Sequence, residues 1–348
     1  MKQKIISIFI FIIIFFLFGI IFGKEFLDFQ NNKLKTKEEK EEITRLANSF
    51  ELSKIKTLEQ TDLFFAPDEK LLEDFIDKIK NSKKRVYIEV YMFTEKRILE
   101  ELKKAKSRGI DIKIILEKSP YMTENINNKH FQELKKANID IKWSNTKNYY
   151  LNHSKFFIID DLAIISTGNL TYSTFTINRD FFVFSKDEEI VNTLKDIFLV
   201  DFEGKKQDFY QENIILSPNY SRIKLEKLLK SATKNIKIYI QYLKDKEINR
   251  LLISLKKEKN LDIEIIIDKS NYNDEQINIL KKYNIKIKEF DGKKMHAKAI
   301  LVDEKYLFIG SINFSEFSID KNRELGIILV NEEIIKNFNK LFIGDFNL

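Results

Sequence analysis

The sequence predicts an α/β fold made of two similar α/β/α repeats related by a pseudo-twofold axis and preceded by one N-terminal transmembrane helix. Three observations lead to this prediction. Short apolar stretches alternate with amphipathic stretches of helical period over residues 61–348, as they do in α/β proteins. The order of these stretches in residues 61–204 recurs in residues 205–348. Each half also contains one copy of the pattern H-x-K-x4-D.

The first 23 residues have the pattern of a membrane anchor or a secretory signal. Lys2 and Lys4 precede residues 5–23, a run of 19 residues without a charged side chain, and such a run can span a bilayer as a helix. No small-x-small cleavage site follows it, which favours an uncleaved anchor over a cleaved signal peptide. The positive charges before the run predict that the rest of the chain lies outside the cytoplasm, and it would be secreted if the segment were cleaved.

Residues 24–60 are rich in Lys, Glu, Asn and Thr and are expected to form a charged spacer. The first repeat, residues 61–204, follows this spacer. In it we expect strands at 63–65, 86–93, 110–116, 139–141, 156–159, 163–166 and 181–184, and helices at 68–79, 98–105, 131–137 and 188–198. The second repeat, residues 205–348, is expected to contain the same elements in the same order.

The two repeats share a register. Residues 110–112 (Ile-Asp-Ile) recur at 261–263 (Leu-Asp-Ile), 151 residues later. The pattern histidines, His153 and His296, are only 143 residues apart, so about eight residues are missing from the second copy before His296. A shared register followed by one deletion is what duplication of a domain leaves. Two such repeats should pack about an axis that brings equivalent segments together.

Composition limits the possible chemistry and partners. With 43% hydrophobic residues, including 30 Phe, the 348-residue chain can bury a sizeable core. The net charge of +7 favours anionic partners such as phospholipid headgroups or nucleic acid, although 60 basic and 53 acidic residues are equally typical of solvated Lys/Glu surfaces. The absence of Cys excludes disulfides, thiol catalysis and Cys-based zinc sites. The three His have no recognisable metal-ligand spacing, so we predict no metal and no cofactor.

The two copies of the pattern supply the candidate catalytic residues His153, Lys155, Asp160, His296, Lys298 and Asp303. Residues i and i+2 of a strand point to the same face, so each His projects together with its Lys. A neutral His can attack phosphorus while a protonated His gives its proton to the leaving oxygen. The two Lys can supply the countercharge that many phosphoryl-transfer enzymes take from Mg²⁺. Both Asp stand at strand ends, where Asp commonly stabilises a turn, and are expected to orient the site rather than carry protons.

These stretches resemble the duplicated signature of the phospholipase D superfamily, which includes phospholipases D, cardiolipin synthases and some nucleases. The second copy matches the longer form H-x-K-x4-D-x6-G-S-x-N, and the resemblance therefore assigns Ser311 and Asn313 to phosphate binding. In the first copy, seven residues rather than six separate the Asp from the Gly, and Asn169 and Thr171 stand where Ser and Asn are usual. The resemblance covers about residues 62–348 and implies the phospholipase D type of repeat.

The resemblance also implies roles for individual residues. It implies a metal-independent site with a phosphohistidine intermediate, in which His153 is the nucleophile and His296 the general acid and base. The triplets Asn-Arg-Asp and Asn-Arg-Glu end at Asp180 and Glu324, at matching places after the two motifs. The family has a carboxylate against each histidine, so we expect these two residues to orient the imidazole rings.

Four residues outside the motif carry weaker predictions. His130 lies in a Lys/Asn-rich segment and is expected at the surface. Trp143, Tyr149 and Tyr150 precede the first motif and are expected either to line a substrate entrance, to contact lipid, or to pack locally.

The leading hypothesis is a membrane-anchored phospholipase D-type phosphodiesterase that hydrolyses the headgroup ester of a phospholipid. Transfer of the phosphatidyl group to an alcohol, as in a cardiolipin synthase, differs only in the acceptor; cardiolipin synthases usually have two membrane spans, and the one predicted here favours hydrolysis. The basic charge supports an exported, metal-independent endonuclease as the alternative, although no extended aromatic and basic groove is evident. A non-catalytic scaffold is disfavoured because both His-Lys pairs are whole. One chain holds both halves of the site, so catalysis requires no oligomer.

Overall fold

The computed structural model describes residues 38, 41–42, 44–271, 275–292 and 294–348. The chain divides into two compact units, residues 1–49 and 50–348. In the smaller unit, residues 44–48 are helical. The transmembrane helix predicted at residues 5–23 lies outside the described residues. None of the helices that are described combines the length and the apolar character needed to cross a bilayer.

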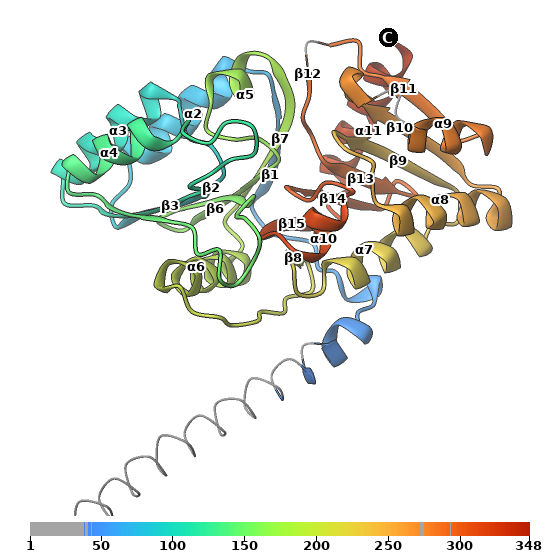
Figure 1. Cartoon of the computed structure of the whole chain (residues 1–348), viewed down its shortest axis with the longest axis horizontal. Helices are drawn as coiled ribbons and strands as arrows, with labels where there is room; N and C mark the ends of the chain where they lie inside the picture. The colour runs from blue at the N-terminus through green and yellow to red at the C-terminus, as the bar shows by residue number, and fades with distance from the viewer. Residues whose placement is uncertain (1–37, 39–40, 43, 272–274, 293) are drawn as a thin grey trace, which may run out of the picture. The chain divides into compact units, whose positions relative to one another are not determined.

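The first repeat forms a mixed sheet with the strand order β1-β7-β6-β5-β2-β3-β4. Its strands are β1 (Thr61–Ala66), β2 (Arg85–Val90), β3 (Asp111–Leu116), β4 (Asp140–Trp143), β5 (Lys155–Ile159), β6 (Leu162–Ser166) and β7 (Asn178–Ser185). Its helices are α2 (Glu69–Lys80), α3 (Lys96–Ser107), α4 (Asn128–Lys136), α5 (Tyr172–Thr176) and α6 (Glu188–Glu203). In Figure 1, α2 to α5 lie on one side of this sheet and α6 on the other.

The second repeat forms a sheet with the order β11-β10-β9-β13-β14-β15-β8, which matches the first sheet position by position. Its strands are β8 (Ile214–Ser217), β9 (Asn235–Ile240), β10 (Asp262–Ile267), β11 (Lys286–Glu289), β13 (Ala299–Val302), β14 (Tyr306–Gly310) and β15 (Glu324–Leu329). Its helices are α7 (Ser221–Lys230), α8 (Lys246–Lys259), α9 (Glu275–Lys282), α10 (Glu316–Asp320) and α11 (Glu332–Asn347). Two 3₁₀ turns are η1 (Leu52–Lys54) and η2 (Lys269–Asn271). The predicted α/β class and the internal repeat are confirmed, and the predicted division at residues 204 and 205 falls between α6 and β8.

Local sequence explains most elements. Helix α2 begins after Asp68, whose carboxylate accepts a hydrogen bond from the backbone N–H of Lys70, and it buries four apolar side chains at helical spacing. The strand predicted at 86–93 ends earlier, at Val90. It ends there because Phe93 leaves the sheet to pair with Leu170 in the turn after β6. Each repeat has its own apolar core of buried aliphatic and aromatic side chains.

The repeats are joined by strand contacts on the N-terminal side of each pattern histidine. The short strand β12 (Lys294–Met295) pairs with β7 of the first repeat, with Met295 opposite Arg179. In the same way, Asn152 pairs with Arg323 of the second repeat. The segment that leads into each histidine is therefore held by the opposite repeat.

Candidate active site

Each pattern histidine is also oriented by a carboxylate from the opposite repeat. His153 Nδ1 lies 2.8 Å from Oε2 of Glu324, and His296 Nδ1 lies 2.8 Å from Oδ1 of Asp180. A carboxylate on Nδ1 stabilises the tautomer that keeps its proton there and leaves the lone pair on Nε2. The structure thus places both predicted carboxylates against histidines, and each pair crosses between the repeats.

Replacing Asp180 with Asn, or Glu324 with Gln, is expected to lower kcat by about 10²–10⁴-fold. An amide keeps the shape of the carboxylate, but its NH₂ group can donate to Nδ1 and so favours the tautomer with the proton on Nε2. In that tautomer His153 cannot attack and His296 cannot accept a proton through Nε2. Steady-state kinetics beside thermal unfolding checks this expectation. A variant with unchanged kcat would show that the crossed pairs hold the repeats together without acting on the reaction.

Burial makes the two histidines weakly basic. It lowers the pKa of both His153 and His296 to about 4, an effect that Lys155 and Lys298 reinforce and that Glu324 and Asp180 oppose. Both rings are therefore neutral near pH 7 before substrate binds, whereas the ordinary imidazole pKa predicts that one of them is partly protonated. An anionic phosphodiester between them would counter the lysine charge and raise the pKa of the ring that acts as the acid.

The two pattern lysines are fully buried beside the histidines. Lys155 Nζ donates to the carbonyl of His153 at 2.6 Å, and Lys298 Nζ bonds to the carbonyl of the other histidine. Their remaining neighbours differ: Lys155 Nζ lies 5.2 Å from the ring centre of Tyr91, whereas Lys298 Nζ donates to Gln241 Oε1 at 3.3 Å. The sequence motif did not indicate Tyr91 or Gln241, which occupy equivalent positions just after β2 and β9.

Asp160 and Asp303 lie away from the histidines, at the turns of the two hairpins. The carboxylate of Asp160 accepts hydrogen bonds from the backbone N–H groups of residues 83, 84 and 85, at 2.7 to 2.9 Å. Asp303 accepts in the same way from residues 233, 234 and 235. Both have a positive φ, of 54° and 52°. These contacts fix the start of β2 and β9, so the two Asp of the motif act on the site through the fold.

The phosphate-binding turns align differently from the sequence-based match. Thr171 and Ser315 are the N-cap residues of the equivalent helices α5 and α10. Asn169 and Asn313 each stand two residues before these N-caps, so they occupy equivalent positions. The first copy is one residue shorter because its hairpin turn holds residues 160–161, whereas the second holds 303–305. Asn169 therefore stands where the family has Asn, which corrects the assignment to the Ser position.

Thr167 and Ser311 occupy the position of the family's Ser, and each makes a hydrogen bond at or next to one of the two carboxylates, Asp180 and Glu324. Thr167 donates its hydroxyl proton to Asp180 Oδ1 at 2.6 Å, and the equivalent Ser311 accepts from the backbone N–H of Leu325, the residue after the other carboxylate. Ser311, predicted to bind phosphate, is fully buried beneath the turn. A Cβ on Gly168 would lie 3.0 Å from the carboxyl carbon of Asp180, so a side chain there would displace this carboxylate.

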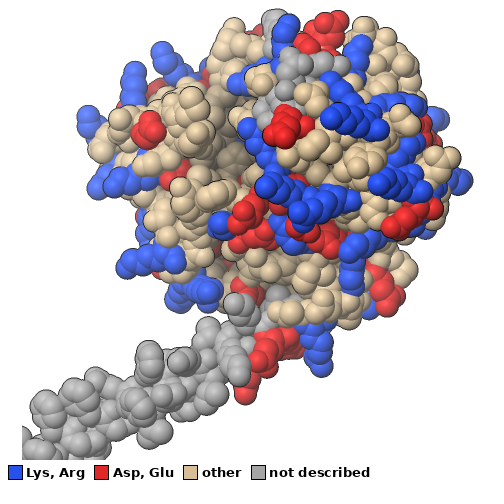
Figure 2. Space-filling model, turned by 45° about the vertical axis from the view of Figure 1, so that its right-hand side comes forward, with Lys and Arg blue, Asp and Glu red and all other residues tan. Residues whose placement is uncertain are grey.

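Both pattern histidines line one cavity of about 350 Å³. The polar residues that line it include His153, His296, Asn169, Thr171, Asn313 and Ser315. Figure 2 shows a hollow between the two repeats. Within the described ranges, no group of three or more His, Cys, Asp or Glu side chains is arranged to hold a metal ion.

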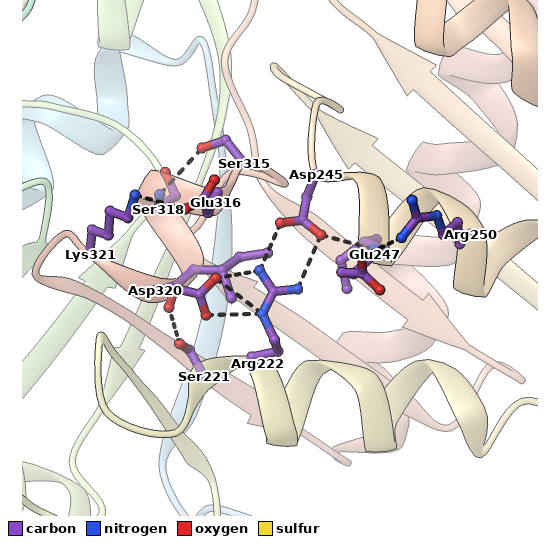
Figure 3. Close-up of polar contacts among 12 residues, drawn as sticks. Ser221, Arg222, Asp245, Glu247, Arg250, Ser315, Glu316, Ser318, Asp320 and Lys321 are labelled. Atoms are coloured by element: carbon purple, nitrogen blue, oxygen red, sulfur yellow. Dashed lines mark hydrogen bonds and ion pairs between the residues drawn. The ribbon is translucent and has the colours of Figure 1, made fainter.

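An ion-pair network fixes the second-repeat side of the cavity (Figure 3). Arg222 on α7 binds Asp245, the N-cap of α8, with Nη2–Oδ2 at 2.8 Å, and binds Asp320 at the end of α10 with Nε–Oδ1 at 2.9 Å. Helix α10 begins at the cavity residue Ser315. The network therefore holds this turn against two longer helices.

The four residues outside the motif have mixed outcomes. His130, expected at the surface, is buried against an aromatic ring because it points inward from α4. Trp143 stacks on Phe131 with ring centres 3.8 Å apart, and Tyr149 is buried, so both pack locally. Tyr150 remains exposed.

The fold and the duplicated motif define a phospholipase D-like protein. Residues 75–201 and 225–346 match the family model "Cardiolipin synthase, PLD-like domain", and the chain therefore belongs to the phospholipase D superfamily through this PLD-like family. The cardiolipin synthase of Clostridium perfringens strain 13 is 23% identical over 350 residues, covering 82% of this chain and 70% of the relative. The probable cardiolipin synthase YwiE of Bacillus subtilis strain 168 is 25% identical over 154 residues, covering 42% of this chain and 30% of the relative.

Two solved structures share the fold. The phosphatidylserine synthase of Haemophilus influenzae Rd KW20 superposes with a TM-score of 0.68 at 14% identity, over 88% of this chain and 90% of its own. The polyphosphate kinase of Porphyromonas gingivalis superposes with a TM-score of 0.65 at 14% identity, over 81% of this chain and 50% of its own. At this identity the likeness concerns the fold alone.

Proposed function

We propose that the chain is a phospholipase D-type phosphatidyltransferase, which moves a phosphatidyl group from one phospholipid to a hydroxyl of another through a phosphohistidine intermediate. The observation that carries the proposal is the pair of crossed histidine–carboxylate contacts beside one cavity. The cardiolipin synthase relatives favour transfer over the hydrolysis that the single predicted membrane span suggests. Hydrolysis, with water as the acceptor, is the second candidate.

The proposed reaction has two displacements at phosphorus. In the first, Nε2 of His153 attacks, the bond from phosphorus to the headgroup oxygen breaks, and His296 gives that oxygen its proton. In the second, His296 takes the proton of the acceptor hydroxyl, whose oxygen attacks phosphorus while the P–N bond breaks and restores His153. Lys155 and Lys298 supply positive charge next to the phosphoryl oxygens throughout.

The product decides between the candidates. The purified full-length chain is incubated in EDTA with phosphatidylglycerol vesicles, and in parallel with single- and double-stranded DNA. Cardiolipin and glycerol are the expected products, and none should form with the double variant His153→Ala/His296→Ala. Phosphatidic acid as the main product would replace transfer by hydrolysis. Cleavage of DNA alone would support the endonuclease and overturn the proposal.

The buried lysine charge predicts loss of activity in alkali. Burial lowers the pKa of Lys298 to about 8, so its cation is present below this pH and is lost as the pH rises through it. We expect kcat/KM to fall above about pH 8, because the phosphate then loses a countercharge. Lys298→Arg keeps its charge, so a pH profile of this variant should lack the alkaline limb at whatever activity it retains. An identical alkaline limb in both proteins would assign it to another group.

The proposal includes attachment to the membrane through residues 5–23, with residues 50–348 outside the cytoplasm. The lysines at positions 2 and 4 and the uncharged run after them support it. Protease treatment of intact cells tests this topology: digestion of the catalytic part is expected, and its full protection would contradict the proposed side.

A further inference from the structure

Exposed aromatic and apolar side chains gather around the opening of the catalytic cavity. Among the described residues, ten large hydrophobic side chains are exposed. Six of them either line this cavity or stand next in the sequence to a residue that lines it. We call these six the mouth collar: Tyr121, Met122, Tyr150, Tyr172, Tyr242 and Phe317. Both repeats contribute to it, and the rings of Tyr150 and Phe317 meet with centres 4.8 Å apart. Such clustering at one place is typical of an interaction surface.

The most exposed part of the collar is firmly attached to the catalytic site. Tyr121 and Met122, 77% and 76% exposed, form the tip of a turn between β3 and α4, where Met122 adopts a φ of 60°. The backbone N–H of Tyr121 donates to the hydroxyl of Tyr91 at 2.6 Å, and the ring of Tyr91 packs edge-on against His153. The turn therefore presents apolar groups to the outside from a fixed position.

Positive charge accompanies the collar. Lys294 lines the same cavity, Lys244 Nζ lies 5.9 Å from the ring centre of Tyr242, and Lys321 Nζ lies 4.6 Å from that of Phe317. Lys321 also pairs with the neighbouring Glu316. Tyr rings beside long cationic side chains are characteristic of the bilayer interface, where Lys is attracted to anionic headgroups.

The size of the cavity indicates what must remain outside it. A volume of about 350 Å³ can hold a headgroup with its phosphate and glycerol. Two acyl chains, each about 15 Å long since the hydrocarbon core is about 30 Å thick, cannot follow them in. The acyl chains of a reacting phospholipid must therefore stay outside the cavity, and those of a membrane lipid can stay in a bilayer that lies against the opening.

We infer that the mouth collar inserts into the interfacial region of an anionic phospholipid bilayer and places the cavity directly over the headgroups. The inference rests on the proposed function for the identity of the substrate. The collar acts in addition to any N-terminal anchor, because it sets the orientation of the catalytic part on the bilayer.

A local fluorescence probe tests the inference in the full-length chain. Trp143, the single Trp, is replaced by Phe, and a new Trp is introduced by Tyr121→Trp or, as the matched control away from the cavity, by Tyr283→Trp. With phosphatidylglycerol vesicles carrying brominated acyl chains, Tyr121→Trp should shift to the blue and lose about half of its intensity, while Tyr283→Trp stays unchanged. Because both proteins keep residues 5–23, an effect confined to position 121 reports on the collar. Equal behaviour of the two probes would overturn the inference.

A second measurement separates docking from catalysis. The double variant Met122→Ser/Tyr150→Ser should lower the ratio of activity on vesicles to activity on a monomeric short-chain phosphatidylglycerol by about tenfold. An unchanged ratio would contradict docking. Failure of the proposed function would look different, since neither substrate would then react in the wild-type protein while the quenching at position 121 would persist.

Discussion

Alanine at His153 is expected to abolish formation of the covalent intermediate, whereas alanine at His296 should prevent the proton transfers to a poor leaving group and from the acceptor hydroxyl. With natural phospholipids both substitutions should lower kcat by at least about 10⁴-fold, because each removes a group that takes part in bond breaking. The two histidines have the same carboxylate support and similarly lowered pKa values, so their surroundings alone do not separate the roles.

The leaving group can separate them. A phosphatidyl ester of p-nitrophenol does not need an acid, because the phenolate leaves readily without a proton. His296→Ala should therefore release a burst of p-nitrophenolate equal to the enzyme concentration, and His153→Ala should release none. The opposite pattern would exchange the two roles, and bursts from both variants would contradict a unique nucleophile.

A stability control belongs with this experiment. Removing His153 leaves the buried carboxylate of Glu324 without its partner, which is costly in its own right. The double variant His153→Ala/Glu324→Gln removes this unpaired charge. If His153 is the nucleophile, the double variant should regain thermal stability and remain without a burst.

The sequence predicted the fold and the two His-Lys pairs because these depend on local pattern. Strand and helix periods, together with the duplicated motif, determine which segments are equivalent. The crossing of the carboxylates could not be predicted, since His153 and Glu324 are 171 residues apart and no local pattern states which repeat supplies the partner. Tyr91 and Gln241 were missed for a related reason, because they follow strands β2 and β9 and reach the lysines only after the sheets have formed.

The turn alignment failed for a different physical reason. Matching Gly168 with Gly310 makes the first copy one residue longer than the second, whereas the structure makes it one residue shorter, because the hairpin of the second repeat has a three-residue turn. The glycines are not equivalent, since Gly310 ends β14 and its Cβ would meet Gly326 at 2.4 Å. The length of the hairpin turn therefore determines which turn residues are equivalent, and the shared Gly does not.

Replacing Arg323 with Ala is expected to destabilise the protein by about 3–5 kcal/mol, the largest stability effect we predict. Arg323 is buried and binds Asp201 of the first repeat through two hydrogen bonds, at 2.7 and 3.0 Å. Without the guanidinium, Asp201 would remain as an unpaired charge near the fully buried Glu89. Urea unfolding followed by circular dichroism measures the change in the free energy of unfolding.

The equivalent pair supplies the matched comparison. Arg179 binds Asp345 of the second repeat at 3.0 Å but is more exposed, so Arg179→Ala should cost less stability than Arg323→Ala.

The double variant Arg323→Met/Asp201→Leu should recover most of the lost stability, because both charges are then removed together. Since the carbonyl of Arg323 accepts the backbone N–H of His153 at 2.8 Å, the activity of this double variant shows whether the ion pair also positions the histidine. Recovered stability with low kcat would assign it a positioning role, whereas recovery of both would make it a purely structural link between the repeats.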